Sequence, residues 1–215
     1  MLSIVIGSDI NGKKVSKYLP SLRNLFVSYM EDNQIKGIIT TLIASCYEDI
    51  GRLLIITKEA NQIDTSRCVY AETYFYNNPE NGSIKNKSQL FARIAKEQQK
   101  QKQGKAINTK KTLVWIDDIW QLYPKLTSKT TIKHFKQLLQ YGYDSKIHFI
   151  IGSVMPYRNL LAQLMRSDTI GGNKHIVSTL GAELIYTPDG LIFFREQDSE
   201  EQQTLYPSTL DFSVL

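Results

Sequence analysis

The sequence predicts a single α/β domain built on a doubly wound, mainly parallel sheet with helices on both faces. Short aliphatic and β-branched runs, typical of buried strands, occur at residues 22–28, 52–58, 112–117 and 146–153. Between them, residues 35–47 and 130–141 repeat apolar side chains at the helical interval. Strands that alternate with helices along a chain favour a parallel sheet.

Two further elements follow from turn chemistry. A strand is expected at residues 67–74, because the asparagine, proline and glycine content of residues 77–83 ends it. Near the end of the chain, residues 182–196 contain two apolar runs joined by a Thr-Pro-Asp-Gly turn. This pattern predicts a C-terminal β-hairpin added at the sheet edge.

Length and composition indicate one domain over residues 1–215, a common size for a single α/β core. Cys46 and Cys68 lie in apolar stretches without metal-site spacing, so we expect buried free thiols. The longest apolar run is far short of the ~20 residues that a spanning helix needs, and the start of the chain has no signal-peptide pattern. We therefore expect a cytoplasmic domain.

The chain carries a formal net charge of +5 and has a sequence pI near 9.0. Much of the local excess lies in residues 96–110, where lysines alternate with glutamines. Such a segment can form a groove for nucleic acid or a solvated helix. Because it lacks aromatic residues that would stack on bases, we favour a helical arm that has Ser88 as its N-cap and projects into water.

Two acidic residues, Asp117 and Asp118, directly follow the predicted strand at residues 112–117. A carboxylate pair at the C-terminal end of a buried strand is where P-loop enzymes hold a magnesium ion and a catalytic base. Aspartate is also a preferred helix N-cap, so the pair can simply begin a helix. The pattern by itself leaves both interpretations open.

The order of motifs resembles the FtsK/SpoIIIE motor family from about Ile6 to Phe194. The segment GSDINGKKVSKYLPSLRNLFVS resembles the family's lead-in, TTLIASC resembles the helix after its phosphate loop, and Asp117 falls on its Walker B aspartate. KIHFIIGSVMP is similar to its sensor strand, and Gly181, Ala182 and Glu183 to its "M-G-A-E" segment. The resemblance implies a RecA-like version of the doubly wound fold.

On that frame the phosphate-binding loop falls between Val27 and Thr41, where the family carries "G-x-x-G-x-G-K-S". This chain has SYMEDNQIKG there, with Ile35 at the lysine position. The glycines are needed because the loop wraps backbone N–H groups around phosphate oxygens. Each carboxylate near a phosphate would cost about 1 kcal/mol even in water. The vestigial nucleotide site would consist of Glu31, Asp32, Asn33, Gln34, Ile35, Lys36, Asp117 and Asp118.

Other polar groups of the motor are altered as well. Val154 and Met155 stand where the family has glutamine and arginine, and Asp118 replaces the Walker B glutamate. The histidines, at positions 134, 148 and 175, have no cysteine or second histidine at ligand spacing. We therefore expect no catalytic residue, no metal site, and loss of ATP and magnesium binding.

By resemblance, the chain is most like the C-terminal ATPase-like domains of EssC/EccC type VII secretion coupling proteins, which share its "V-W-I-D-D" strand. This implies a non-hydrolysing module that binds secreted protein substrates or docks on sibling ATPase domains. The membrane would be reached only through a region outside this chain, and we expect the chain to be a module of a longer protein. The alternatives are a DNA-translocase or conjugation relative that binds DNA, and a still active nucleotide enzyme.

Overall fold

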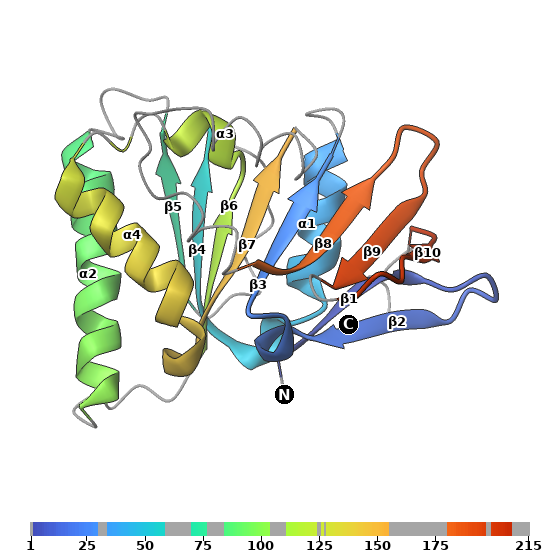
Figure 1. Ribbon diagram of the computed structural model, residues 1–215, viewed down its shortest axis with the longest axis horizontal. Helices are drawn as coiled ribbons and strands as arrows, with labels where there is room; N and C mark the ends of the chain where they lie inside the picture. Colours follow the sequence, from blue (N-terminus) through green and yellow to red (C-terminus); the bar gives the residue numbers. More distant parts are fainter. Residues whose placement is uncertain are drawn as a thin grey trace.

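The computed structural model describes residues 2–29, 34–58, 70–76, 84–103, 111–123, 126, 128–154, 180–196 and 199–207. Within these ranges the chain forms an eight-stranded sheet in the order β10-β9-β8-β3-β7-β6-β4-β5, with helices on both faces (Figure 1). A separate antiparallel pair, β1 (Ser3–Ser8) and β2 (Lys14–Tyr18), lies beside it. The sequence patterns did not predict this pair as a hairpin.

The central strands of the large sheet run parallel. They are β3 (Asn24–Ser28), β4 (Ile50–Thr57), β5 (Ala71–Phe75), β6 (Lys111–Ile116), β7 (Ile147–Ser153) and β8 (Leu180–Tyr186). Each predicted run therefore coincides with a strand, although residues 67–69 lie outside the described part of the chain. The order β8-β3-β7-β6-β4-β5 confirms the RecA-like doubly wound sheet.

The C-terminal hairpin is also confirmed. β9 (Ile192–Glu196) pairs antiparallel with β8, and the Gly190 N–H donates to the Thr187 carbonyl at 3.1 Å. Gly190 has φ +84°, which a side chain rarely tolerates, so the turn requires glycine. The sheet edge is formed by a further short strand, β10 (Gln203–Leu205), which pairs with β9 and was not predicted.

The helices divide the core into two halves. α1 (Gln34–Ala44) packs on one face, where its apolar side chains join those of β1 and the sheet. α2 (Ile84–Lys102), α3 (Ile119–Leu122) and α4 (Lys129–Tyr141) cover the other face. Single 3-10 turns, η1 (Leu19–Leu22), η2 (Tyr47–Asp49) and η4 (Tyr143–Ser145), precede strands. No helix among the described residues is long and apolar enough to cross a membrane.

The prediction of a solvated arm holds only in part for α2: residues 96, 99, 100, 102 and 103 are exposed, but the helix packs on α4 and does not project into water. The helix begins at Ile84, so Ser88 is not its N-cap. Its polar half packs on α4: Gln98 is fully buried and accepts a hydrogen bond from Gln137 at 3.4 Å. The Lys102 ammonium lies 4.8 Å from the centre of the Tyr141 ring. Gln98 is four residues after Ile94, so both lie on the same buried face of α2. The sequence pattern did not reveal this, because a buried helix face is recognised by apolar residues and glutamine is polar.

Candidate functional site

The candidate nucleotide site lies where the C-terminal ends of β3, β7 and β6 meet, at the edge where parallel α/β sheets bind ligands. β3 ends at Ser28, and the next residue, Tyr29, donates its backbone N–H to the Ser153 carbonyl at 3.0 Å. Asp117 follows β6 and donates its own N–H to the Ile56 carbonyl of β4 at 2.8 Å. The structure therefore brings Asp117 beside the start of the expected phosphate loop.

Tyr29 occupies the space between these strand ends. When Ile35 is aligned with the family's lysine, Tyr29 falls on the first glycine of the phosphate loop. Its side chain is only 2% exposed, and its hydroxyl donates to the Asp117 carbonyl at 2.9 Å. A glycine would leave this volume open to a ligand. The sequence patterns did not single out Tyr29, although the substitution of the first glycine was a visible signal.

Asp117 is buried, with 5% of its surface exposed. One carboxylate oxygen, Oδ2, accepts from the Thr57 hydroxyl at 3.0 Å and from the Lys58 N–H at 3.5 Å. Gly152 of β7 passes so closely that a β-carbon there would lie 2.2 Å from the Asp117 carbonyl oxygen. This aspartate is therefore fixed by β4, β6 and β7 together.

Asp118 caps a helix. It is the N-cap of α3, and its Oδ1 accepts from the Trp120 N–H at 2.9 Å. Of the two interpretations that the sequence left open, the helix start is the one observed for Asp118. With 3% of its surface exposed, it stabilises the turn that leads β6 away from the site.

The remaining predicted site residues are placed only in part. Glu31, Asp32 and Asn33 lie outside the described residues, and residues 34–36 form the first turn of α1. Val154 follows β7, whereas Met155 lies outside the description. In the part of the chain that is described, no cluster of His, Cys, Asp and Glu could hold a metal ion.

The histidines and cysteines, for which no site was expected, are also described only in part. Burial lowers the pKa of His148, in β7, to about 4, although a hydrogen bond to the Arg23 backbone acts against the burial. His134 lies on α4 as predicted, and His175 and Cys68 lie outside the described residues. Cys46 is a buried free thiol, as expected.

An apolar pocket of about 280 Å³ lies beside the first turns of α1. Its walls come from β1, α1 and the β8–β9 hairpin, and they include Ile6, Gly37, Ile38, Thr41, Tyr186 and Ile192. Gly37 is helical, yet a β-carbon there would meet no atom within 4 Å. Glycine in a helix costs about 1 kcal/mol relative to alanine. Gly37 therefore lines the pocket without a side chain, at some cost in stability.

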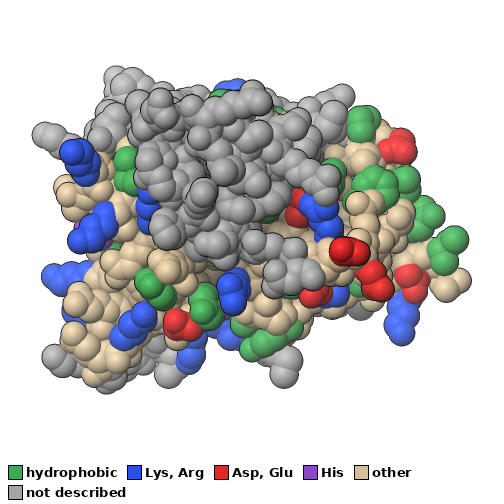
Figure 2. Space-filling view, in the orientation of Figure 1, with side chains coloured by type: hydrophobic (Ala, Val, Ile, Leu, Met, Phe, Trp, Pro, Cys, Tyr) green, Lys and Arg blue, Asp and Glu red, His purple; other side chains and the backbone are tan. Residues whose placement is uncertain are grey.

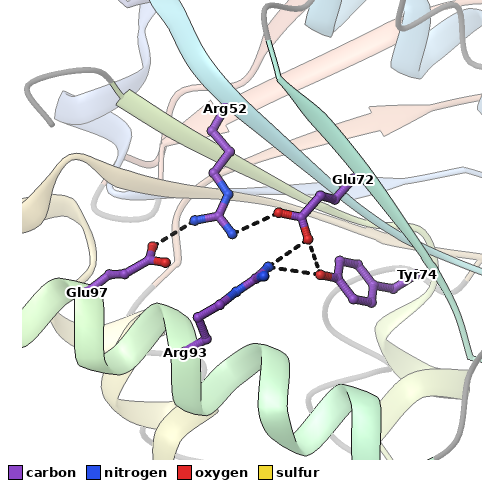
Figure 3. Close-up of polar contacts among 5 residues, drawn as sticks. All are labelled: Arg52, Glu72, Tyr74, Arg93 and Glu97. Atoms are coloured by element: carbon purple, nitrogen blue, oxygen red, sulfur yellow. Dashed lines mark hydrogen bonds and ion pairs between the residues drawn. The ribbon is translucent and has the colours of Figure 1, made fainter.

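A polar network near the N-terminal ends of β4 and β5 joins these two strands to α2 (Figure 3). Glu72 accepts from Arg52 at 3.1 Å and from Arg93 at 2.7 Å, and the Tyr74 hydroxyl also donates to it. Arg52 further contacts Glu97 of α2 at 2.7 Å. Burial alone would raise the pKa of Glu72, but the hydrogen bonds from Arg93 and Tyr74 outweigh it and lower the pKa to about 2. The network holds the edge strand against the helix.

Solved structures similar to this chain include ATPase domains of secretion proteins and a conjugation coupling protein. The chain matches Thermomonospora curvata EccC (ATPases 2 and 3, in complex with a signal sequence peptide) with a TM-score of 0.65 and 17% identity, over 97% of this chain and 41% of that one. It matches the pCW3 conjugation coupling protein TcpA, with ATPγS, with a TM-score of 0.66 and 11% identity, over 95% and 66%. It matches EssC (ATPases 2 and 3) from Geobacillus thermodenitrificans with a TM-score of 0.63 and 10% identity, over 100% of this chain and 46% of that one. The chain spans less than two thirds of each of these proteins.

No protein-family model matches the chain, and no curated protein sequence matches it significantly. At these identities the likeness is one of fold. The chain has the RecA-like α/β fold of the ATPase domains in type VII secretion ATPases and in a conjugation coupling protein. The likeness to EccC and EssC that the motifs predicted is therefore confirmed at the level of the fold.

Proposed function

We propose that this chain is a non-hydrolysing, ATPase-like module of a type VII protein secretion coupling ATPase. It acts by binding secreted substrates or by docking on sibling ATPase domains, on the cytoplasmic side of a membrane that it reaches through a region outside this chain. The fold shared with EccC and EssC supports the class of protein. The buried Tyr29 side chain, bonded to the Asp117 carbonyl, supports the loss of hydrolysis.

Tyr29 argues against nucleotide binding in two ways. Its ring takes up the volume that a glycine would leave between the ends of β3 and β6. Its hydroxyl ties these strand ends together through a direct contact at 2.9 Å, so that no ligand is needed to bridge them. The sequence adds Ile35 in place of the phosphate-binding lysine.

The test is the thermal stability of the full chain in 5 mM ATPγS with magnesium. A ligand with a Kd of about 50 µM would stabilise the fold by roughly 2.7 kcal/mol at that concentration, a shift of several degrees in Tm. We expect no shift in the native chain or in Asp117→Asn. A shift in the native chain that Asp117→Asn abolishes would show a working magnesium nucleotide site and refute the proposal.

For substrate binding, the pocket beside Gly37 is the best candidate. EccC was solved with a signal sequence peptide, and an apolar pocket walled by α1 and a hairpin suits one apolar side chain of such a peptide. The pocket lies close to α1, so a peptide bound there would take a position near the altered loop.

Filling the pocket tests this assignment. A β-carbon at Gly37 meets no atom within 4 Å, so Gly37→Leu adds bulk to the pocket lining at a position that has room for it. Gln140→Leu adds a leucine at an exposed position of α4 as a control. A 12-residue peptide selected by phage display on the native chain is titrated against both variants. We expect Gly37→Leu to weaken binding at least tenfold and Gln140→Leu to leave it unchanged. Equal binding by both variants would place the peptide elsewhere.

A further inference from the structure

The turn that joins β1 to β2 projects from the rest of the molecule (Figure 1). In this turn the Asp9 N–H donates to the Lys13 carbonyl at 2.9 Å, and the Gly12 N–H donates to the Asp9 carbonyl at 3.0 Å. The Asp9 carboxylate accepts from the N–H groups of Asn11 and Lys13, each at 2.9 Å. Gly12 has φ +76°, a conformation that favours glycine. The turn is therefore held by its own backbone and by Asp9.

Ile10 is the residue of this turn that has no local role. None of these hydrogen bonds uses its side chain, and turns favour Gly, Pro, Asn, Asp and Ser over β-branched apolar residues. Its side chain is 80% exposed, more than any other large apolar side chain in the described part of the chain. A well-ordered turn thus holds an isoleucine out in water, where a polar residue would serve the turn equally well.

A concavity of about 420 Å³ lies directly beside Ile10. Its walls come from the β1–β2 hairpin and from the chain just after β10. Ser8 and Tyr206 exchange two backbone hydrogen bonds, each of 2.8 Å, so these two walls are fixed to each other. Tyr206 is a second exposed apolar side chain, at 39%. We define the hairpin patch by residues that line this concavity: Ser8, Asp9, Ile10, Lys14, Tyr206 and Pro207.

The hairpin patch carries charges of both signs. Among the described residues, the charged ones that line the concavity are Lys14, which is exposed, and Asp9, which is partly buried. Figure 2 shows hydrophobic, basic and acidic side chains together at the right-hand end of the molecule, where the hairpin projects. The patch therefore combines a protruding apolar side chain, a concavity, a cation and an anion, and such a surface is complementary to itself.

We propose that the hairpin patch is a two-fold interface between two copies of this chain. Each copy inserts Ile10 into the concavity of the other, against Tyr206, and Lys14 of each copy faces Asp9 of the other. A two-fold contact uses the same surface on both partners, so the knob and the concavity must lie side by side on one chain, as they do here. This interface goes beyond the proposed function and does not rest on it.

Other partners match the hairpin patch less completely. An anionic partner would use Lys14 and be repelled by Asp9 in the same concavity. A lipid surface is bound by several apolar residues on a basic face, whereas this turn offers one isoleucine beside a carboxylate. A second copy uses the isoleucine, the concavity and both charges at once.

The contact is small, at the low end of protein interfaces, so the dimer is weak and depends on concentration. The hydrogen bonds within the turn and between Ser8 and Tyr206 order the patch before association, which lowers the entropy that binding costs. We expect a dissociation constant between about 10 and about 500 µM.

Sedimentation velocity of the full chain, from about 5 to about 500 µM, measures the association. Ile10→Ser removes the apolar side chain from both halves of the contact, and we expect it to weaken the dimer roughly 100-fold or more. The turn keeps its hydrogen bonds in this variant, because none of them uses Ile10. Tyr141→Ser removes a side chain that is 41% exposed at the end of α4, and this control should associate as the native chain does.

A second variant tests the charges. Lys14→Glu places a carboxylate opposite Asp9 of the other copy, and the repulsion should weaken the dimer at least about tenfold. Lys133→Glu makes the same change of charge at an exposed position of α4 and should leave the association unchanged. Circular dichroism of each variant confirms that the fold is kept.

Four results would each overturn the proposal. They are a native chain that stays monomeric at the highest concentration, an Ile10→Ser variant that dimerises like the native chain, an equal loss in either control, and assembly into trimers or larger rings. A dimer that is lost in Ile10→Ser, weakened in Lys14→Glu and kept in both controls supports it.

Discussion

Replacing Glu72 with glutamine tests how the edge of the sheet is held. The carboxylate joins β5 to α2 through Arg93 and to β4 through Arg52. Its pKa is about 2, against an ordinary value of 4.5 for glutamate. At 1.36 kcal/mol per pKa unit, the shift of about 2.5 gives an upper value of about 3.4 kcal/mol. Solvent around the exposed Arg93 screens the charges, so we expect a loss of roughly 2 kcal/mol at pH 7.

The pH dependence follows from the direction of the shift. The folded protein holds Glu72 ionised, whereas in the unfolded chain this carboxyl is protonated below about pH 4.5. Its stabilisation is therefore complete above pH 4.5 and is lost as the pH falls through 2. Glu72→Gln is neutral throughout, so the difference from the native chain should shrink over this window.

Denaturant unfolding at pH 7, 4 and 2 measures the difference. Glu201→Gln, on an exposed residue before β10, removes one charge elsewhere and should change stability by less than about 0.5 kcal/mol. If the native chain and Glu72→Gln differ as much at pH 2 as at pH 7, the stabilisation comes from packing and the electrostatic reasoning fails.

Four further changes have expected outcomes. Because the pKa of His148 is lowered to about 4, native stability should fall from about pH 6.5 towards pH 4, and His148→Gln should flatten that part of the profile in pH-dependent denaturation. Gly181→Ala places a β-carbon 2.0 Å from the Leu22 carbonyl oxygen, and we expect it to cost about 1–3 kcal/mol in denaturant unfolding. Gly37→Ala meets no atom within 4 Å and should instead stabilise by about 1 kcal/mol, so a loss there would contradict the open pocket. Asp118→Ala removes the cap of α3 and should lower the unfolding free energy by about 1 kcal/mol, whereas no change would mean that water replaces the cap.

Local patterns were reliable where one interaction dominates. Buried parallel strands such as β6 and β7 appear as continuous apolar runs, because both of their faces are covered. The hairpin at Gly190 followed from a turn that requires glycine. The packing of the polar end of α2 was not predicted, because Gln98 is buried by α4, a helix that lies far along the chain.

The candidate site was predictable only in outline. Asp117 and the altered loop could be found because motif order places them, and Asp118 could not be assigned because one carboxylate suits both a cap and a metal. The Tyr29 contact and the pocket at Gly37 needed coordinates, because each depends on elements that are distant in the sequence. The vestigial character of Glu31, Asp32 and Asn33 stays a prediction, since these residues lie outside the described part of the chain.

The sequence alone determined the alternation of strands and helices between β3 and β9, the C-terminal turn and the replacement of the phosphate-loop glycines, because these depend on residues close together in the chain. The β1–β2 pair and β10 were not predicted. Tertiary structure decided which side chain fills the altered site and which charged residues surround Glu72. Strand order and helix packing decide these contacts, because they bring together residues from positions that no local periodicity connects.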